Sequence, residues 1–143
     1  MVADIHGVLF RNCTALDTTF GCHIKMKDNQ SGCVSNITYE NIIISQTVGA
    51  YERRVMHGDW SGYAIGIHQQ NQGGSDTDPG QNRSLGSEQI LERDFARVQI
   101  EDITYRDIKA EGLFAGQFIC ADALTCRGLV LENVHLNASR GGC

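Results

Sequence analysis

The pattern of apolar and polar positions repeats four times along this chain. Each copy has an apolar residue, two spacers, a second apolar residue, a variable residue, an aromatic residue or leucine, a charged residue, Asn or Asp, and a final apolar residue. The copies occupy residues 5–13, 34–42, 100–108 and 126–134. Apolar residues at the fourth and sixth positions alternate with polar or variable ones. This period of two predicts a strand with one buried face in every copy.

The eighth position of the template holds a turn residue in every copy: Asn12, Asn41, Asp107 and Asn133. Asn and Asp tolerate the left-handed backbone conformation that a sharp corner requires. Asn12 and Asn41 are 29 residues apart, and Asp107 and Asn133 are 26 apart. Short strands, polar corners and this repeat length are typical of a β-solenoid. We therefore interpret these four residues as structural, either as corner residues or as a ladder of side chains.

The repeat predicts an all-β fold, a right-handed parallel β-helix of about four to five coils. A β-sandwich is the alternative, but it does not predict the recurring Asn. A leucine-rich repeat would require a leucine pattern that the chain lacks. The template occurs on both sides of a polar stretch, so we expect residues 1–143 to form a single domain. That stretch, at about residues 70–95, is predicted to be one long inserted loop.

Composition and charge narrow the choice of partner. Hydrophobic residues make up 41% of the chain, as in a folded globular protein. The 12 basic and 17 acidic residues give a net charge of −5, which disfavours nucleic acid and anionic membrane as partners. The chain has no run of 18 apolar residues, and residues 1–6 lack the features of a signal peptide. For a secreted protein, the leader would then lie upstream of these residues.

The cysteine content leaves two interpretations open. The chain has six cysteines: Cys13, Cys22, Cys33, Cys120, Cys126 and Cys143. Six cysteines allow 15 disulfide connectivities, so the sequence fixes none of them. Buried free thiols and two or three disulfides are equally compatible with the spacing. Cys120 with Cys126 is the first pairing to consider. No Cys/His spacing resembles a zinc site, and we expect no metal and no cofactor.

Two segments carry a family resemblance. Residues 21–27 read G-C-H-I-K-M-K, and residues 31–42 read S-G-C-V-S-N-I-T-Y-E-N-I. Together they resemble the polygalacturonases of glycoside hydrolase family 28, whose pattern is G-x-R-I-K, a short Gly-containing loop, and G-x-V-x-N-I-x-[FY]-x-N-I. Residues 64–69, A-I-G-I-H-Q, resemble the family's P-I-x-I-x-Q segment. The resemblance covers residues 5–69 well and extends more loosely to about residue 138.

This resemblance implies a secreted, extracellular enzyme that hydrolyses the α-1,4-galacturonan of pectin with inversion. Inversion needs one carboxylic acid to protonate the leaving oxygen and one carboxylate to activate water. The family supplies these groups from N-T-D and Asp-Asp motifs, with a nearby G-H-G, all before R-I-K. The present chain contains none of these motifs. We therefore expect a truncated C-terminal part with no catalytic residue. Sequons at Asn12, Asn36, Asn82 and Asn137 are compatible with secretion.

The remaining candidate site is a set of basic side chains on one face. Alternation in residues 22–27 places His23, Lys25 and Lys27 outward, with Ile24 and Met26 inward. The same alternation in the next coil places His68 outward. Coils stack about 4.8 Å apart, which would bring His68 close to His23 and Lys25.

The candidate cluster of His23, Lys25 and His68 suits an acidic polysaccharide such as polygalacturonate, because Lys pairs with carboxylates as a point charge. Lys25 matches the family Lys, whereas His23 stands in place of the family Arg. A histidine there would weaken carboxylate binding above roughly pH 6.5. Each of these side chains could equally be ordinary solvated surface.

Two hypotheses without catalysis remain beside the hydrolase. The chain could be a non-catalytic β-helix that binds acidic polysaccharide through the His23 and Lys25 face, or a purely structural solenoid. In each case an exposed coil end would favour self-association, because its strand edge has no neighbour.

Overall fold

The computed structural model consists of strands and short connections in the part that it describes, residues 2–18, 20–26, 30–45, 63–69, 97–112, 114–121 and 125–139. The strands are β1 (Val2–Leu16), β2 (Cys22–Lys25), β3 (Ser31–Ser45), β4 (Tyr63–His68), β5 (Arg97–Gly112), β6 (Phe114–Ile119) and β7 (Cys126–Ala138). Among these residues there is no helix long and apolar enough to span a bilayer.

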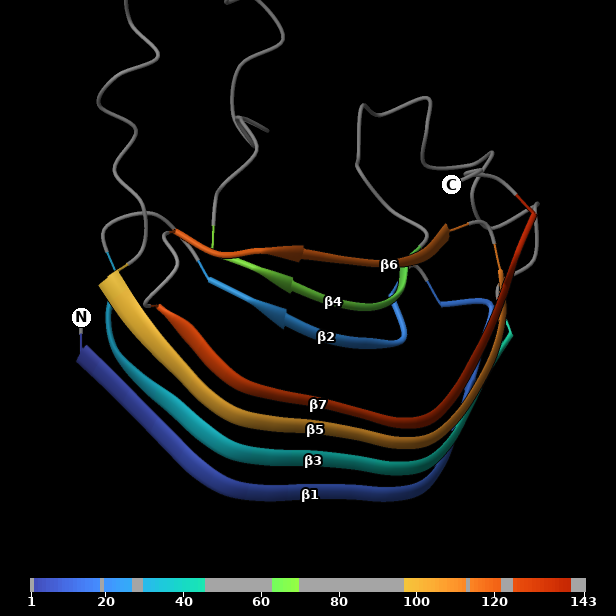
Figure 1. The fold of residues 1–143 in the computed structure, drawn as a ribbon, viewed down its shortest axis with the longest axis horizontal. Helices are drawn as coiled ribbons and strands as arrows, with labels where there is room; N and C mark the ends of the chain where they lie inside the picture. The colour runs from blue at the N-terminus through green and yellow to red at the C-terminus, as the bar shows by residue number, and fades with distance from the viewer. Residues whose placement is uncertain are drawn as a thin grey trace, which may run out of the picture.

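The strands form two parallel sheets that face each other. The long strands pair in the order β1-β3-β5-β7, and the short strands pair in the order β2-β4-β6. Each long strand bends twice, and the short strands lie across the open side of the resulting trough (Figure 1). Successive turns of the chain therefore stack in parallel, which confirms the predicted β-helix. The loop predicted at about residues 70–95 lies outside the described residues.

The two bends of each long strand are made by residues with positive φ. The predicted corner holds Asn12, Asn41, Asp107 and Asn133, with φ of 57°, 53°, 53° and 53°. A second corner, five positions earlier, holds Gly7, Asn36, Asp102 and Gly128, with φ of 70°, 53°, 55° and 64°. The template had treated these positions as spacers, and this part of the interpretation is wrong. Gly, Asn and Asp share the capacity for left-handed backbone, which suits them to the same corner.

At Gly128 glycine is favoured by the lack of space for a Cβ atom as well as by the positive φ. A Cβ atom at this position would lie 2.5 Å from Asp102 Oδ1 and 3.0 Å from the Asp102 backbone nitrogen. Both neighbours belong to the corner of the preceding coil. The close approach of the two corners therefore requires glycine here.

Side chains at the predicted corner form the expected ladder. The Asn41 amide donates to Asn12 Oδ1 at 2.7 Å, and the Asn133 amide donates to Asp107 Oδ1 at 2.5 Å. These bonds join adjacent coils at the point where the backbone turns. They also give Asn and Asp an advantage over glycine at this corner, since glycine would turn equally well but could not bond.

The core is a set of columns in which each template position stacks on itself. The aromatic column shows this most clearly. Phe10 and Tyr39 lie 5.0 Å apart between ring centroids, and Tyr39 and Tyr105 lie 5.2 Å apart, with an angle of 7° between the planes of each pair. Tyr105 is fully buried. The register pairs the other inward positions in the same way, including Val8 with Ile37 and Ile103 with Leu129. The two apolar template positions thus build one continuous core.

A disulfide closes the turn before β7. Cys120 and Cys126 are bonded, with 5.9 Å between their Cα atoms, which is the pairing considered first from the sequence. Cys13, Cys22 and Cys33 are free thiols, and Cys22 is buried in the core. Cys143 lies outside the described residues. One bridge and three free thiols, one of them exposed, one partly buried and one buried, therefore coexist in the described part of the chain.

The fully buried Gln69 fixes the end of β4 to the coil above it. Its Nε2 donates to Val98 O at 2.5 Å, and its Oε1 accepts from Ala121 N and Thr125 Oγ1, both at 2.8 Å. A buried amide with these partners is satisfied on both sides, so it holds the two coils together at little cost. It immediately follows His68, whose position it helps to fix.

The contribution of the left-handed corner at Asn41 to the free energy of unfolding can be measured by substitution. We expect Asn41→Ala to lower the free energy of unfolding by about 1–2 kcal/mol, because alanine loses the bond to Asn12 and is strained at positive φ. Asn41→Gly should fall between wild type and alanine, since glycine turns freely but cannot bond. Urea denaturation followed by circular dichroism measures both changes. Equal stabilities for the two variants would contradict backbone strain as a cause.

Candidate functional site

The outer face of the three-stranded sheet carries the predicted site residues. β2 and β4 pair so that His23 lies beside Gly66 and Lys25 beside His68. Ile24 and Ile67, which alternate with them, are buried in the core. The alternation predicted for these strands is therefore confirmed, and His23, Lys25 and His68 lie on the same face.

Aromatic rings cover the two histidines. The ring of Phe20 stacks on His23 with centroids 4.1 Å apart, and His23 meets His68 edge-on at 4.7 Å. Tyr63 approaches His68 edge-on at 5.8 Å. His68 consequently keeps only 8% of its surface exposed, although it belongs to the outward-facing set. The expected nearness of the two histidines is confirmed, but they form a packed pair and not an open basic surface.

Gly66 provides the space in which the pair packs. A Cβ atom there would lie 3.0 Å from Gln117 O, 3.4 Å from His23 Cδ2 and 3.7 Å from His68 Nε2. Both imidazoles thus lie over a residue without a side chain. A larger residue at position 66 would displace them outward.

Burial keeps both imidazoles neutral. Loss of solvent is the main cause that lowers the pKa of His23 from 6.5 to about 4, and the charges of His68 and Lys25 contribute to the same shift. Burial also lowers the pKa of His68, as does Lys25, while a hydrogen bond with the Gln117 side chain opposes this. The expected decline of carboxylate binding above roughly pH 6.5 moves down to about pH 4 for His23.

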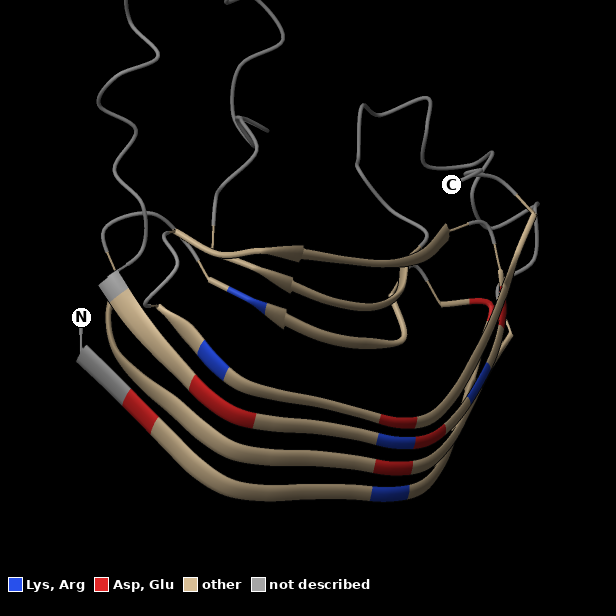
Figure 2. Cartoon of the chain, viewed as in Figure 1, with Lys and Arg blue, Asp and Glu red and all other residues tan. Residues whose placement is uncertain are grey.

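Lys25 supplies the positive charge of this face. β4 and β6 contain no Lys, Arg, Asp or Glu, and Lys25 is the charged residue of β2. In Figure 2 the three-stranded sheet is accordingly uncoloured apart from one blue stretch on β2. Lys25 is exposed at the end of its strand. Lys27, predicted on the same face, lies outside the described residues.

The histidines also retain unused bonding capacity. His23 Nε2 and His68 Nε2 are buried and have no hydrogen-bond partner among the described residues. A neutral imidazole has one donor nitrogen and one acceptor nitrogen, and a buried polar atom without a partner costs roughly 1–3 kcal/mol. The face therefore combines one exposed cation with two imidazole nitrogens that are enclosed by the packing around them.

The sequence motifs found some of these residues and missed others. His23, Lys25 and His68 lie within segments that carry the family pattern. Phe20 lies before that pattern, and Gln117 lies on β6, which matches no template. A lone aromatic residue or glutamine has no distinguishing spacing, so the sequence held no signal for them.

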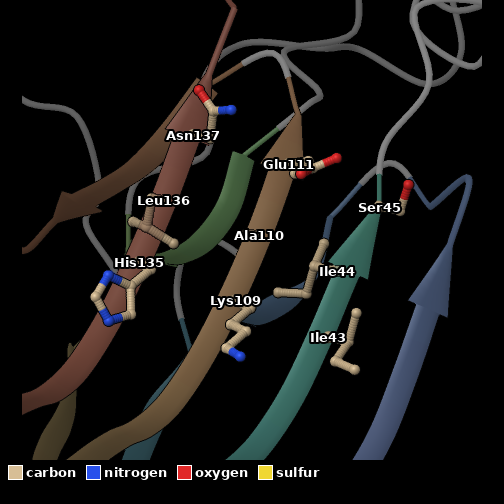
Figure 3. Close-up of a pocket in the computed structure, with 9 residues that line it drawn as sticks. All are labelled: Ile43, Ile44, Ser45, Lys109, Ala110, Glu111, His135, Leu136 and Asn137. Atoms are coloured by element: carbon tan, nitrogen blue, oxygen red, sulfur yellow. The ribbon is translucent and has the colours of Figure 1, made fainter.

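A hollow elsewhere on the molecule is less suited to an acidic ligand. It has a volume of 590 Å³ and is lined by the last residues of β3, β5 and β7, as Figure 3 shows. Lys109 and Glu111 contribute opposite charges to it. His135 Nε2 lies 3.0 Å from Asn133 Oδ1 within its own strand. The described residues also bring no three His, Cys, Asp or Glu side chains together as a metal site.

The lowered pKa of His23 makes stability depend on pH. Between pH 6.5 and about 4 the unfolded chain binds a proton at this residue while the folded chain does not, so stability should fall as the pH is lowered through this window. We expect His23→Gln to flatten the decline in melting temperature between pH 7 and pH 4.5. His135→Gln, at an exposed position of β7, is the matched control and should keep the full slope. Equal slopes in both variants would contradict the assignment.

Comparison with known proteins agrees with the family resemblance. The model of the glycosyl hydrolases family 28 matches residues 1–51. The chain is 28% identical over 139 residues to a protein named probable endopolygalacturonase D, from Neosartorya fischeri. That alignment covers 96% of this chain and 24% of the relative, so the chain spans about a quarter of the relative's length. No solved structure matches the chain. Both matches agree with the resemblance to the polygalacturonases of glycosyl hydrolase family 28.

Proposed function

We propose that this chain forms the part of a polygalacturonase-like glycoside hydrolase that holds the carboxylate of galacturonate. The complete reaction would be hydrolysis of α-1,4-galacturonan with inversion, which requires two carboxyl groups on opposite sides of the bond. The 143 residues lack the motifs that carry those groups in the family. The role of this chain in the reaction is therefore to bind and orient substrate.

The observation that carries this proposal is the position of Lys25. It is an exposed cation and the charged residue of the three strands β2, β4 and β6, and it occupies the Lys position of the family pattern. A single ammonium group attracts a carboxylate without requiring a fixed approach angle. Within β2, β4 and β6, no carboxylate competes with a sugar acid for the lysine.

Histidines 23 and 68 have a different role from the arginine of the family pattern. Burial lowers the pKa of both imidazoles, so at neutral pH they add no charge to that of Lys25. Their Nε2 atoms are buried, so a sugar hydroxyl group does not reach them in this packing. We propose that Lys25 selects for the acid group, while His23 and His68 form an uncharged, packed surface beside it.

An extracellular location accompanies this proposal. Pectin is a cell-wall polymer, so an enzyme that degrades it works outside the cell. The bond between Cys120 and Cys126 fits an oxidising environment, because intracellular thiols are normally kept reduced.

The role of Lys25 predicts a loss of binding when its charge is removed. We expect Lys25→Ala to weaken binding of oligogalacturonate about tenfold or more at pH 6 and low salt, because a hydrogen bond to a charged group contributes about 1.5–3 kcal/mol. Lys109→Ala is the matched control, because Lys109 is an exposed lysine of β5 on a different face. Isothermal titration calorimetry measures both affinities. Equal affinities for the two variants would reject the assignment of Lys25.

A second function is binding without catalysis, and the absence of the catalytic motifs favours it. We expect the purified 143-residue chain to bind oligogalacturonate but to release no reducing ends from polygalacturonate above a heat-denatured control. Reducing-end release at any pH between 4 and 7 would mean that the chain carries catalytic carboxylates outside the family motifs. Absence of both binding and hydrolysis would favour the purely structural solenoid.

A further inference from the structure

One sequon of the chain lies at an exposed bend of the β-helix. Asn36, Ile37 and Thr38 form the tripeptide Asn-x-Thr, the acceptor sequence for N-linked glycans in secreted proteins. Asn36 has a φ of 53° and is one of the residues at which β3 bends. The acceptor asparagine is therefore presented at a turn of the backbone, as a bulky surface modification requires.

Asn36 is exposed although a coil lies on either side of it. The register places it between the bend at Gly7 of β1 and the bend at Asp102 of β5. Ile37, the next residue along the strand, is only 3% exposed. The exposure of Asn36 thus belongs to the bend itself and does not arise at an edge of the sheet.

The two neighbouring bends leave room beside the Asn36 side chain. Gly7, on the preceding coil, has no side chain. Asp102, on the following coil, has its carboxylate against the coil beyond, because its Oδ1 would lie only 2.5 Å from a Cβ atom at Gly128. Neither neighbour therefore occupies the space into which a group attached to Asn36 would extend.

The Asn36 side chain is also not part of the ladder that joins adjacent coils. At the other bend the Asn41 amide donates to Asn12 Oδ1 at 2.7 Å. In the part of the chain that the structure describes, no hydrogen bond holds the side chain of Asn36. A sugar on Asn36 Nδ2 therefore breaks no bond between coils, whereas the other corner sequon, at Asn12, belongs to the ladder.

We propose that Asn36 carries an N-linked glycan in the secreted protein. Asn36 Nδ2 forms a bond to C1 of the first N-acetylglucosamine of a lipid-linked oligosaccharide. The bond from C1 to the oxygen of the lipid diphosphate breaks, the lipid diphosphate leaves, and one amide proton is released, with no oxidation or reduction. This inference rests on the extracellular location proposed above and not on the binding of galacturonate.

A glycan at this bend leaves the candidate binding face uncovered. The long strands bend on the side of the trough opposite to β2, β4 and β6, as Figure 1 shows. Lys25 belongs to β2, on the outer face of the short strands. The glycan consequently adds bulk and polarity to a part of the β-helix remote from Lys25.

Expression of the 143-residue chain behind a cleavable leader in a secreting eukaryotic host tests the proposal. Such a host supplies the transferase whatever the natural location of the protein. Enzymatic removal of N-glycans in heavy-oxygen water converts each modified asparagine into labelled aspartate, which peptide mass spectrometry then locates. We expect the label at Asn36 in most copies of the secreted chain. The conversion keeps the bend, because the next coil has aspartate at the same corner, Asp102 with a φ of 55°.

Thr38→Val removes the acceptor hydroxyl and keeps a β-branched residue in the strand, so it should lose one glycan in the intact mass. Thr104→Val is the matched control, because Thr104 lies opposite Thr38 on β5 but belongs to no sequon, and it should keep the glycan. The chain retained in the cells is measured with the secreted chain, so a poorly exported variant still gives a result.

An unlabelled Asn36 in both fractions would overturn the proposal, as would equal glycan content in Thr38→Val and wild type. A chain that is modified at Asn36 but does not bind oligogalacturonate would support the glycan and reject the role of Lys25. The two outcomes therefore separate this modification from the proposed function.

Discussion

The structure depends on parallel strands stacked in register about 4.8 Å apart. This spacing places a residue directly over its counterpart in the next coil, so every coil must bend at the same two positions. The bends require left-handed backbone, which only Gly, Asn and Asp provide without large strain. Once the two corners align, inward apolar residues form columns, corner amides form a ladder, and charged residues alternate on the surface. A single geometric condition thus organises the core, the ladder and the candidate site.

The sequence predicted those strands and corners whose residues follow a local pattern, and it missed those that depend on neighbouring coils. The long strands were predictable because their template keeps the same residue class at each position. The corner of Gly7, Asn36, Asp102 and Gly128 was missed because Gly and Asn share a backbone conformation but no side-chain property. β6 was missed because its alternation is too short to separate from chance without its neighbours. Its place in the sheet follows from pairing with β4, which is a long-range interaction.

The sequence likewise predicted one part of the candidate site and not the other. That His23, Lys25 and His68 lie together followed from strand alternation and coil spacing, which are local rules. Their ionisation did not follow, because it depends on which groups exclude water from the rings. Phe20 covers His23, and Gly66 leaves the space below both imidazoles. Neither residue belongs to a charged motif, so the sequence pattern could not show that packing lowers the pKa of both histidines.

The unequal spacing of the coils has a consequence for engineering. Corresponding corners are 29 residues apart between β1 and β3, 66 between β3 and β5, and 26 between β5 and β7, yet the register is maintained across all three pairings. The connections between strands thus vary in length without disturbing the columns, because the closure entropy of a loop rises only slowly with its length. Foreign peptides could therefore be grafted into these connections. The β-helix could then serve as a display scaffold, because the stacked strands keep their register whatever the length of the insert.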